Sequence, residues 1–134
     1  MNIAKIMIPK VCTAFLREDN TIRQGLETMT YHGYTALPVL DPNQHYVGSI
    51  TEGDFLRYMM EKGTTDKRAL EQDCIGKILR RDFCPALSMD SDNQTILSAI
   101  LNQNFVPIVD SRNVLCGILT RRGVISHLAE KSEK

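Results

Sequence analysis

The sequence predicts an α+β fold built from two copies of one β-α-β-β-α repeat. A frame of four residues occurs twice with the same internal spacing, 69 residues apart: Pro38, Asp41, Gly48 and Thr51, then Pro107, Asp110, Gly117 and Thr120. The apolar runs and turn residues around each frame also follow in the same order. Because each copy alone is too small to bury its apolar faces well, we expect the two to pack into one core.

The first copy begins with short elements and then a longer helix. Residues 3–8 are predicted as a helical turn that a proline ends, and residues 11–16 as a short extended run. Asn20 or Thr21 can cap the helix that follows, and Gly33 ends it.

Two apolar strands follow this helix, at residues 35–40 and 46–50, joined by a turn rich in Asp, Pro and Asn. A second helix is expected over residues 52–61. Its inward face is predicted to carry Phe55, Leu56 and Met59.

The second copy repeats this order. It has an extended run at residues 85–87, a helix at 92–102, strands at 106–109 and 114–119, and a helix at 121–130. A looser match, between KIM at residues 5–7 and KIL at 77–79, has an offset of 72.

These boundaries divide the chain into three parts. We assign residues 1–62 to the first repeat, 63–73 to a polar linker and 74–134 to the second repeat.

Composition excludes some classes of function. The chain has 134 residues, 43% of them apolar, and sixteen basic residues balance sixteen acidic ones. A net charge of zero argues against broad nucleic-acid binding, which depends on many phosphate contacts. No long apolar run indicates a membrane span or a signal peptide, so we expect a cytoplasmic protein.

The reactive side chains form no familiar catalytic or metal-binding pattern. The four cysteines, Cys12, Cys74, Cys84 and Cys116, lack C-x-x-C spacing, so we expect no metal site. Buried free thiols are the simpler interpretation, although disulfides stay open. Since there is also no nucleophile elbow, phosphate loop or His-Glu metal motif, we expect neither an enzyme nor a cofactor.

The two frames differ in the charge that follows their threonine. GSITEGD ends in Asp54, whereas GILTRRG carries Arg121 and Arg122 and has Gly123 in place of the acid. An acid in the first turn of a helix either caps that helix or accepts hydrogen bonds from ribose hydroxyls. Two guanidiniums at a helix start oppose its dipole, which a bound phosphate would offset; a solvated surface pair is the alternative.

Thr51 and Thr120 have two compatible roles. Each can cap the helix that it precedes, and each brings a hydroxyl group and free backbone N–H groups to a place that suits phosphate.

The repeat order, the strands PVLD and PIVD, and the Gly-x-x-Thr-x-x-Asp ending together resemble a tandem pair of cystathionine-β-synthase (CBS) domains, or Bateman module. The resemblance covers nearly the whole chain. It implies adenine nucleotides bound in two clefts, each built crosswise from both repeats, and a flat homodimer formed through the helices.

The resemblance assigns residues to both clefts. The first would combine Lys10, Cys12, Thr13, Tyr34, Thr35, Ala36, Thr120, Arg121 and Arg122. The second would combine Thr51, Asp54, Cys84, Pro85, Ala86, Phe105 and Val106.

GYTALPVLDP, QNFVPIVD and LTRRGVI further resemble a bacterial subgroup of stand-alone CBS pairs that bind cyclic di-AMP. The likeness implies that Lys10 and the paired arginines hold phosphate, and that Tyr34 stacks on adenine. An exposed lysine and a core tyrosine are the respective alternatives. Cys12 departs from the expected small residue, and the subgroup often lacks an acid at the position of Asp54.

The expected function is therefore a regulatory protein that senses an adenine nucleotide, cyclic di-AMP first, and controls a partner enzyme. An AMP or ATP energy sensor that uses Asp54 is one alternative. A structural interaction module with degenerate clefts is the other. His32, His45 and His127 are assigned no role.

Overall fold

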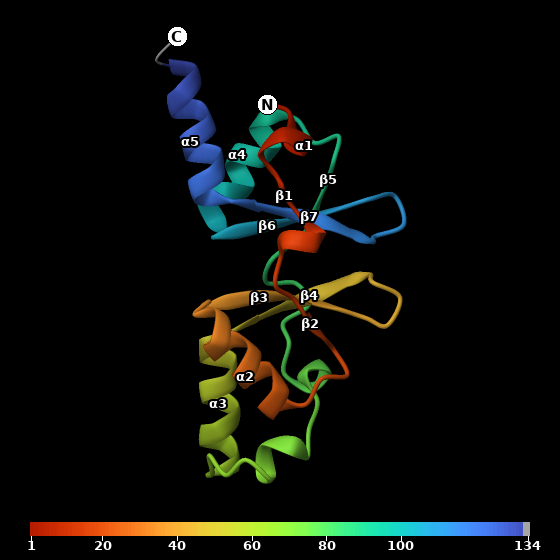
Figure 1. Ribbon diagram of the computed structural model, residues 1–134, viewed down its shortest axis with the longest axis vertical. Helices are drawn as coiled ribbons and strands as arrows, with labels where there is room; N and C mark the ends of the chain where they lie inside the picture. Colours follow the sequence, from red (N-terminus) through yellow and green to blue (C-terminus); the bar gives the residue numbers. More distant parts are fainter. Residues whose placement is uncertain (133–134) are drawn as a thin grey trace. The chain divides into compact units, whose positions relative to one another are not determined.

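The computed structural model describes residues 1–132, and the chain divides into two compact units (Figure 1). We call residues 14–83 the central unit, and residues 1–13 together with 84–134 the terminal unit. The predicted α+β class is confirmed. Among the described residues, no helix has the length and apolar character that crossing a membrane requires.

The central unit is a three-stranded sheet with two helices on one face (Figure 1). Its strands are β2 (Leu16–Arg17), β3 (Ala36–Leu40) and β4 (Tyr46–Thr51). Strand β2 runs parallel to β3, and β3 runs antiparallel to β4. The helices are α2 (Ile22–His32) and α3 (Glu52–Lys62).

Local signals set the ends of helix α2. Thr21 and Gln24 form a capping box, in which the Thr21 hydroxyl accepts from the Gln24 N–H at 3.0 Å. Gly33 ends the helix in the left-handed conformation, with φ of 69°. The predicted helix and both of its ends are therefore confirmed.

The core of the central unit lies between the sheet and these helices. It is formed by Leu16, Ile22, Met29, Leu37, Val39, Ile50, Phe55, Tyr58, Leu70 and Ile75. The prediction that Leu56 faces inward is wrong, since its side chain is 57% exposed. Helix α3 instead turns Phe55 and Tyr58, three positions apart, toward the sheet.

The segment predicted as a linker, residues 63–73, is part of the central unit. It contains the short helix η2 (Ala69–Glu71), and Leu70 is buried in the core. Asp73 then accepts the N–H of Ile22 through its carbonyl at 3.0 Å. Its carboxylate accepts from the Tyr58 hydroxyl and from Lys77 Nζ at 3.1 Å.

These contacts predict a stability loss in acid. The bonds from Tyr58 and Lys77 lower the pKa of Asp73 to about 2. A lowered carboxyl pKa stabilises the fold above pH of about 4 and loses that contribution as the pH falls toward 2. We therefore expect the melting temperature, measured by circular dichroism, to fall further between pH 5 and pH 2 in the wild type than in Asp73→Asn. Equal losses would contradict this role.

The terminal unit has a four-stranded sheet in the order β1-β7-β6-β5. The strands are β1 (Ile8–Pro9), β5 (Leu87–Ser88), β6 (Phe105–Val109) and β7 (Leu115–Thr120). Its helices are α1 (Ile3–Ile6), α4 (Asn93–Asn102) and α5 (Arg121–Ser132). A second core, of Ile3, Ile96, Ile100, Val106, Ile108, Leu119 and Val124, fills this unit, so the expected single core is wrong.

Each sheet is completed by a segment from the other sequence repeat. In the terminal unit, β1 from the start of the chain pairs antiparallel with β7. At the equivalent edge of the central unit, Arg80 pairs with Ser49 of β4. The compact units therefore do not coincide with the sequence repeats, and this exchange gives each unit a core of its own.

The exchanged segments explain the glycine of the repeated frame. A Cβ atom on Gly117 would lie 2.3 Å from the Ile8 carbonyl oxygen, and one on Gly48 would lie 2.6 Å from the Arg80 carbonyl oxygen. No side chain fits at such distances. The glycines therefore let the edge segment approach the sheet.

Candidate functional site

The threonine of each frame caps the helix that follows it. The Thr120 hydroxyl accepts from the Gly123 N–H at 2.9 Å, and the Thr51 hydroxyl accepts from the Asp54 N–H at 3.3 Å. Thr51 also donates its hydroxyl proton to Asp54 at 3.0 Å. The capping interpretation is confirmed for both threonines.

Asp54 is buried and held by residues of its own unit. One carboxylate oxygen accepts from Arg80 Nε at 2.7 Å and from Arg57. The other accepts from the Thr51 N–H at 2.8 Å and from the Thr51 hydroxyl. Both oxygens are therefore engaged, and Asp54 is only 5% exposed.

The environment keeps Asp54 ionised. Burial raises the pKa of a carboxyl group, but the bonds from Arg80 and Thr51 outweigh it, so the pKa of Asp54 lies below its usual range. A ribose at this carboxylate would have to displace Arg80 or Arg57.

Arg121 and Arg122 have different surroundings. Arg121 is half-buried, and its Nε donates to the Ile100 carbonyl at 2.9 Å while Nη2 donates to the Gln103 carbonyl at 3.3 Å. A positive charge at the start of α5 opposes the dipole of that helix. The hydrogen bonds of Arg121 to carbonyl groups at the end of helix α4 offset this cost. Arg122 is exposed.

The first-strand segment lies in the same unit as these arginines. Residues 10–12 form a short 3₁₀ helix, η1 (Lys10–Cys12), so the predicted extended run over 11–16 is wrong. Figure 1 shows η1 on the opposite side of the terminal sheet from α4 and α5. Lys10 is half-buried and Cys12 is exposed. The Thr13 hydroxyl donates to the Pro9 carbonyl at 3.0 Å, which holds the turn closed.

The residues predicted for the second cleft from the terminal unit are gathered by Gln103. Its side-chain amide donates to Cys84 Sγ at 3.1 Å and to the carbonyls of Pro85 and Phe105 at 3.2 and 3.3 Å. Cys84 also donates to the Phe105 carbonyl at 3.3 Å. Ala86, which follows Pro85 in the sequence, is half-buried, and Val106 lies in the core of the terminal unit.

Tyr34, Thr35 and Ala36 belong to the central unit. Tyr34 is 48% exposed, and Ala36 opens strand β3. The Thr35 carbonyl accepts the N–H of Glu52, which ties this segment to the start of α3. The structure thus brings Thr51 together with Asp54, and Cys84 and Pro85 together with Phe105. Within residues 1–132, by contrast, no hydrogen bond joins Lys10, Cys12 or Thr13 to Arg121 or Arg122. The grouping of residues across units stays a prediction.

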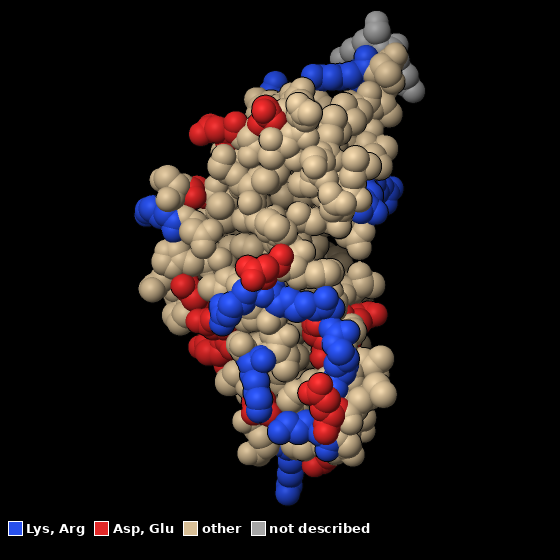
Figure 2. All heavy atoms as spheres, turned by 180° about the vertical axis from the view of Figure 1, so that it is seen from behind, with Lys and Arg blue, Asp and Glu red and all other residues tan. Residues whose placement is uncertain are grey.

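Charges of both signs alternate on the central unit. Figure 2 shows Lys and Arg side chains beside Asp and Glu side chains. Arg81 pairs with Glu18 at 3.8 Å and Lys77 with Asp73 at 3.1 Å. Such a surface does not present the single-sign patch that nucleic-acid binding uses.

No part of the chain described here offers a metal site or a disulfide. Within residues 1–132, no three His, Cys, Asp or Glu side chains are placed to hold a metal ion. All four cysteines are free thiols, of which Cys84 is buried while Cys12 and Cys74 are exposed. The expectation of buried thiols therefore holds for Cys84 and fails for Cys12 and Cys74, while Cys116 is half-buried.

Comparison with known proteins identifies the fold of the chain and the family of its first repeat. Residues 3–61 match the family model of the CBS domain. These residues, which make up most of the first repeat, form a CBS domain. The structure of CbpB in complex with c-di-AMP has the same fold, with a TM-score of 0.87 at 19% identity over 97% of this chain and 85% of that one.

Two further proteins have higher sequence identity to this chain. Cyclic di-AMP receptor B of Bacillus subtilis (strain 168) is 26% identical over 126 residues, which cover 94% of this chain and 85% of the relative. The Listeria monocytogenes CbpB protein in complex with c-di-AMP is 25% identical, with a TM-score of 0.81 over 99% of this chain and 98% of that one. The predicted CBS pair is confirmed.

Sequence reasoning missed two polar residues that shape the sites of this CBS pair. Arg80 occupies the position equivalent to Ile8 at the offset of 72, so the looser repeat could have placed it beside β4 and Asp54. No sequence pattern pointed to Gln103. Two of its three acceptors are backbone carbonyls, which every residue has, and the third is a thiol.

Proposed function

We propose that this CBS pair is a non-catalytic sensor of cyclic di-AMP. Lys10, Cys12, Thr13, Tyr34, Thr35, Ala36, Thr120, Arg121 and Arg122 would form its binding site. Three findings support the proposal: the named receptor from Bacillus subtilis, the c-di-AMP complex from Listeria monocytogenes, and the pair of arginines that follows the second threonine.

The observation that carries the choice of ligand is the difference between Asp54 and Arg122. A sensor of AMP or ATP needs a carboxylate open to ribose hydroxyls, whereas both oxygens of Asp54 are engaged by Arg80, Arg57 and Thr51. Arg122 is exposed at a helix start, where its guanidinium can form a paired hydrogen bond with phosphate. This contrast favours a ligand recognised through its phosphates.

Isothermal titration calorimetry of the purified protein tests the proposal. We expect the titration with cyclic di-AMP to give a single binding transition. AMP, ATP and cyclic di-GMP should bind at least about 100-fold more weakly, a difference in binding free energy of about 2.7 kcal/mol. Preferential binding of AMP or ATP would overturn the choice of ligand and make Asp54 the candidate ribose acceptor. If no nucleotide binds, the structural interaction module becomes the better hypothesis.

We further propose that the ligand controls a partner enzyme through a homodimer in the cytoplasm. A ligand shifts a conformational equilibrium only if it binds the two states with different affinity. The exposed apolar side chains support the dimer: Leu97, Leu101, Ile125 and Leu128 lie along α4 and α5 and line one groove. A contiguous apolar surface of this kind is typical of an interface.

The dimer predicts a specific effect of one substitution. Leu101 is 81% exposed in the α4–α5 groove, so Leu101→Glu should convert the dimer into a monomer in light-scattering chromatography. Ser98→Glu places the same charge on the polar groove of the same helix and should leave the mass unchanged. A wild type that elutes as a monomer would refute the dimer.

A further inference from the structure

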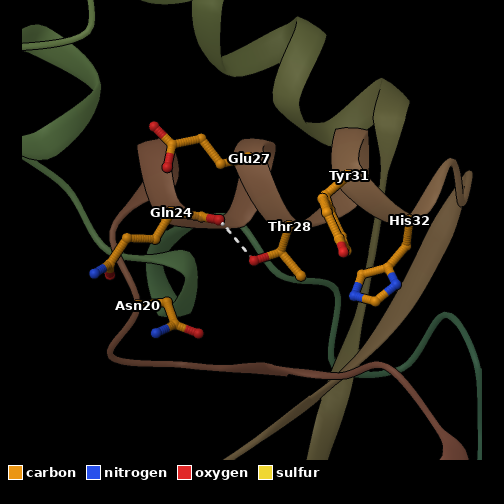
Figure 3. A pocket seen from close by; sticks show the side chains of 6 residues that line it. All are labelled: Asn20, Gln24, Glu27, Thr28, Tyr31 and His32. Atoms are coloured by element: carbon orange, nitrogen blue, oxygen red, sulfur yellow. Dashed lines mark hydrogen bonds between the residues drawn. The ribbon is translucent and has the colours of Figure 1, made fainter.

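An aromatic row lies at the end of helix α2, and the cleft assignments include only one of its three residues, Tyr34. Tyr31 and His32 contact each other edge to face, with ring centroids 5.1 Å apart and an angle of 89°. His32 lies parallel to Tyr34, with centroids 5.6 Å apart and an angle of 5°. His32 is therefore the middle ring of three. Figure 3 shows Tyr31 and His32 pointing to the same side of α2.

The backbone holds this row in place. Gly33 adopts φ of 69°, and its N–H donates to the carbonyls of Met29 and Thr30 at 2.9 and 3.2 Å. The Tyr34 N–H also donates to the Met29 carbonyl, at 3.3 Å. These hydrogen bonds from Gly33 and Tyr34 to carbonyls of the last turn of α2 fix the position of Tyr34 relative to His32.

We infer that His32 is a positioning residue for the adenine ring of the ligand. Stacked against one face of Tyr34, it holds the tyrosine ring so that another face is ready for a base. This inference rests on the proposed function. It assigns to His32 a role in affinity without direct contact with the ligand.

The physical argument concerns the freedom of an exposed side chain. Tyr34 is 48% exposed, and a tyrosine in solvent exchanges between rotamers on a fast timescale. A base stacked on an aromatic ring contributes binding energy only after that ring is ordered. The parallel contact with His32 orders the ring before the ligand arrives, and Tyr31 restrains His32 from its edge.

The row also distinguishes the two repeats. No aromatic residue stands at the matching positions of the second repeat, 69 residues later, which are Ile100, Leu101 and Gln103. Gln103 instead uses its side chain to join Cys84 with the Phe105 carbonyl. Within the described residues, the aromatic row of the first repeat therefore has no counterpart at the matching positions of the second.

Four variants separate the aromatic role of His32 from other roles. His32→Ala removes the ring, His32→Phe keeps a ring, and His32→Lys keeps a cation at the helix end without a ring. His45→Ala is the matched control, because His45 is half-buried in a turn of the same unit and bonds Asp41 at 3.0 Å. Since His32 is exposed, its variants should keep the melting temperature within about 2 °C.

Calorimetry with cyclic di-AMP gives the first readout. We expect His32→Ala and His32→Lys to bind about tenfold more weakly, and His32→Phe and His45→Ala to stay within about twofold of the wild type. In the Tyr34→Ala background, His32→Ala should cause no further loss, because the ring that it positions is gone. Wild-type affinity for His32→Ala, or additive losses, would overturn the inference while the proposed function stands.

Nuclear magnetic resonance of ¹³C-labelled tyrosine in the free protein gives a second readout that needs no ligand. His32→Ala should shift and broaden the ring signals of Tyr34, and His32→Phe should leave them sharp. Unchanged Tyr34 signals in His32→Ala would overturn the inference. A wild type that binds no cyclic di-AMP would refute the proposed function and the ligand role of His32 together.

Discussion

Replacing Arg122 by alanine is expected to weaken cyclic di-AMP binding about 10- to 100-fold. A hydrogen bond to a charged group contributes about 1.5–3 kcal/mol, and a guanidinium can make two with one phosphate. Since Arg122 is exposed, the melting temperature should change by no more than about 2 °C. Calorimetry measures the affinity, and differential scanning fluorimetry checks the fold.

Arg121→Ala is the informative comparison, because Arg121 and Arg122 are neighbours with different contacts. Arg121 donates to the carbonyls of Ile100 and Gln103, so its loss should lower the free energy of unfolding by about 1–3 kcal/mol. Arg122→Lys keeps the charge without the planar fork, and should bind with intermediate affinity. If Arg122→Ala binds normally while Arg121→Ala stays stable and loses binding, the roles of the two arginines are the reverse of those proposed.

Gly117→Val is expected to lower the free energy of unfolding by about 3 kcal/mol, in the upper range for an overpacked site. Its Cβ atom would lie 2.3 Å from the Ile8 carbonyl oxygen and 2.8 Å from Met7 Cγ. The neighbouring strand β1 would have to move away from β7. Because β1 leads directly into Lys10, we also expect the affinity for cyclic di-AMP to fall. Urea denaturation measures the first effect.

Gly53→Ala is the matched control for this prediction. Gly53 lies in the first turn of α3, where an added Cβ would lie at an ordinary 3.6 Å from Arg57 Nη1 and from the Thr51 hydroxyl oxygen. Alanine in a helix should raise the stability by about 0.5–1 kcal/mol. Similar unfolding midpoints for Gly117→Val and Gly53→Ala would show that the strand approach at Gly117 is not tight.

Signals that lie within a few residues of one another predicted most of the fold. Thr21 and Gly33 mark both ends of α2 in the sequence, because capping and the left-handed turn depend on one side chain and one backbone position. The identical frames placed β3 with β4 and β6 with β7. Strand pairing of this kind joins neighbouring segments, so the local pattern was sufficient.

Contacts between distant segments were not predictable in the same way. Asp54 and Arg80 are 26 positions apart, and only the pairing of Arg80 with Ser49 brings them together. The polar composition of residues 63–73 indicated a linker, yet one apolar side chain, Leu70, anchors that segment in the core. The candidate site was therefore predicted as a set of residues, whereas the sequence did not reveal that Asp54 and Arg121 already have partners.

The origin of the sheet edges has a consequence for the repeats as separate pieces. A cut after residue 73 would leave one fragment without the backbone of Arg80 beside Ser49, and the other without β1 beside β7. Each fragment would expose an unpaired edge, which tends to recruit another strand. Each would also carry the segment that the other lacks. The boundaries of the sequence repeat therefore differ from the boundaries of the unit that has its own core. The two fragments should regain the native structure only when they are mixed, because each supplies the edge segment that the other lacks.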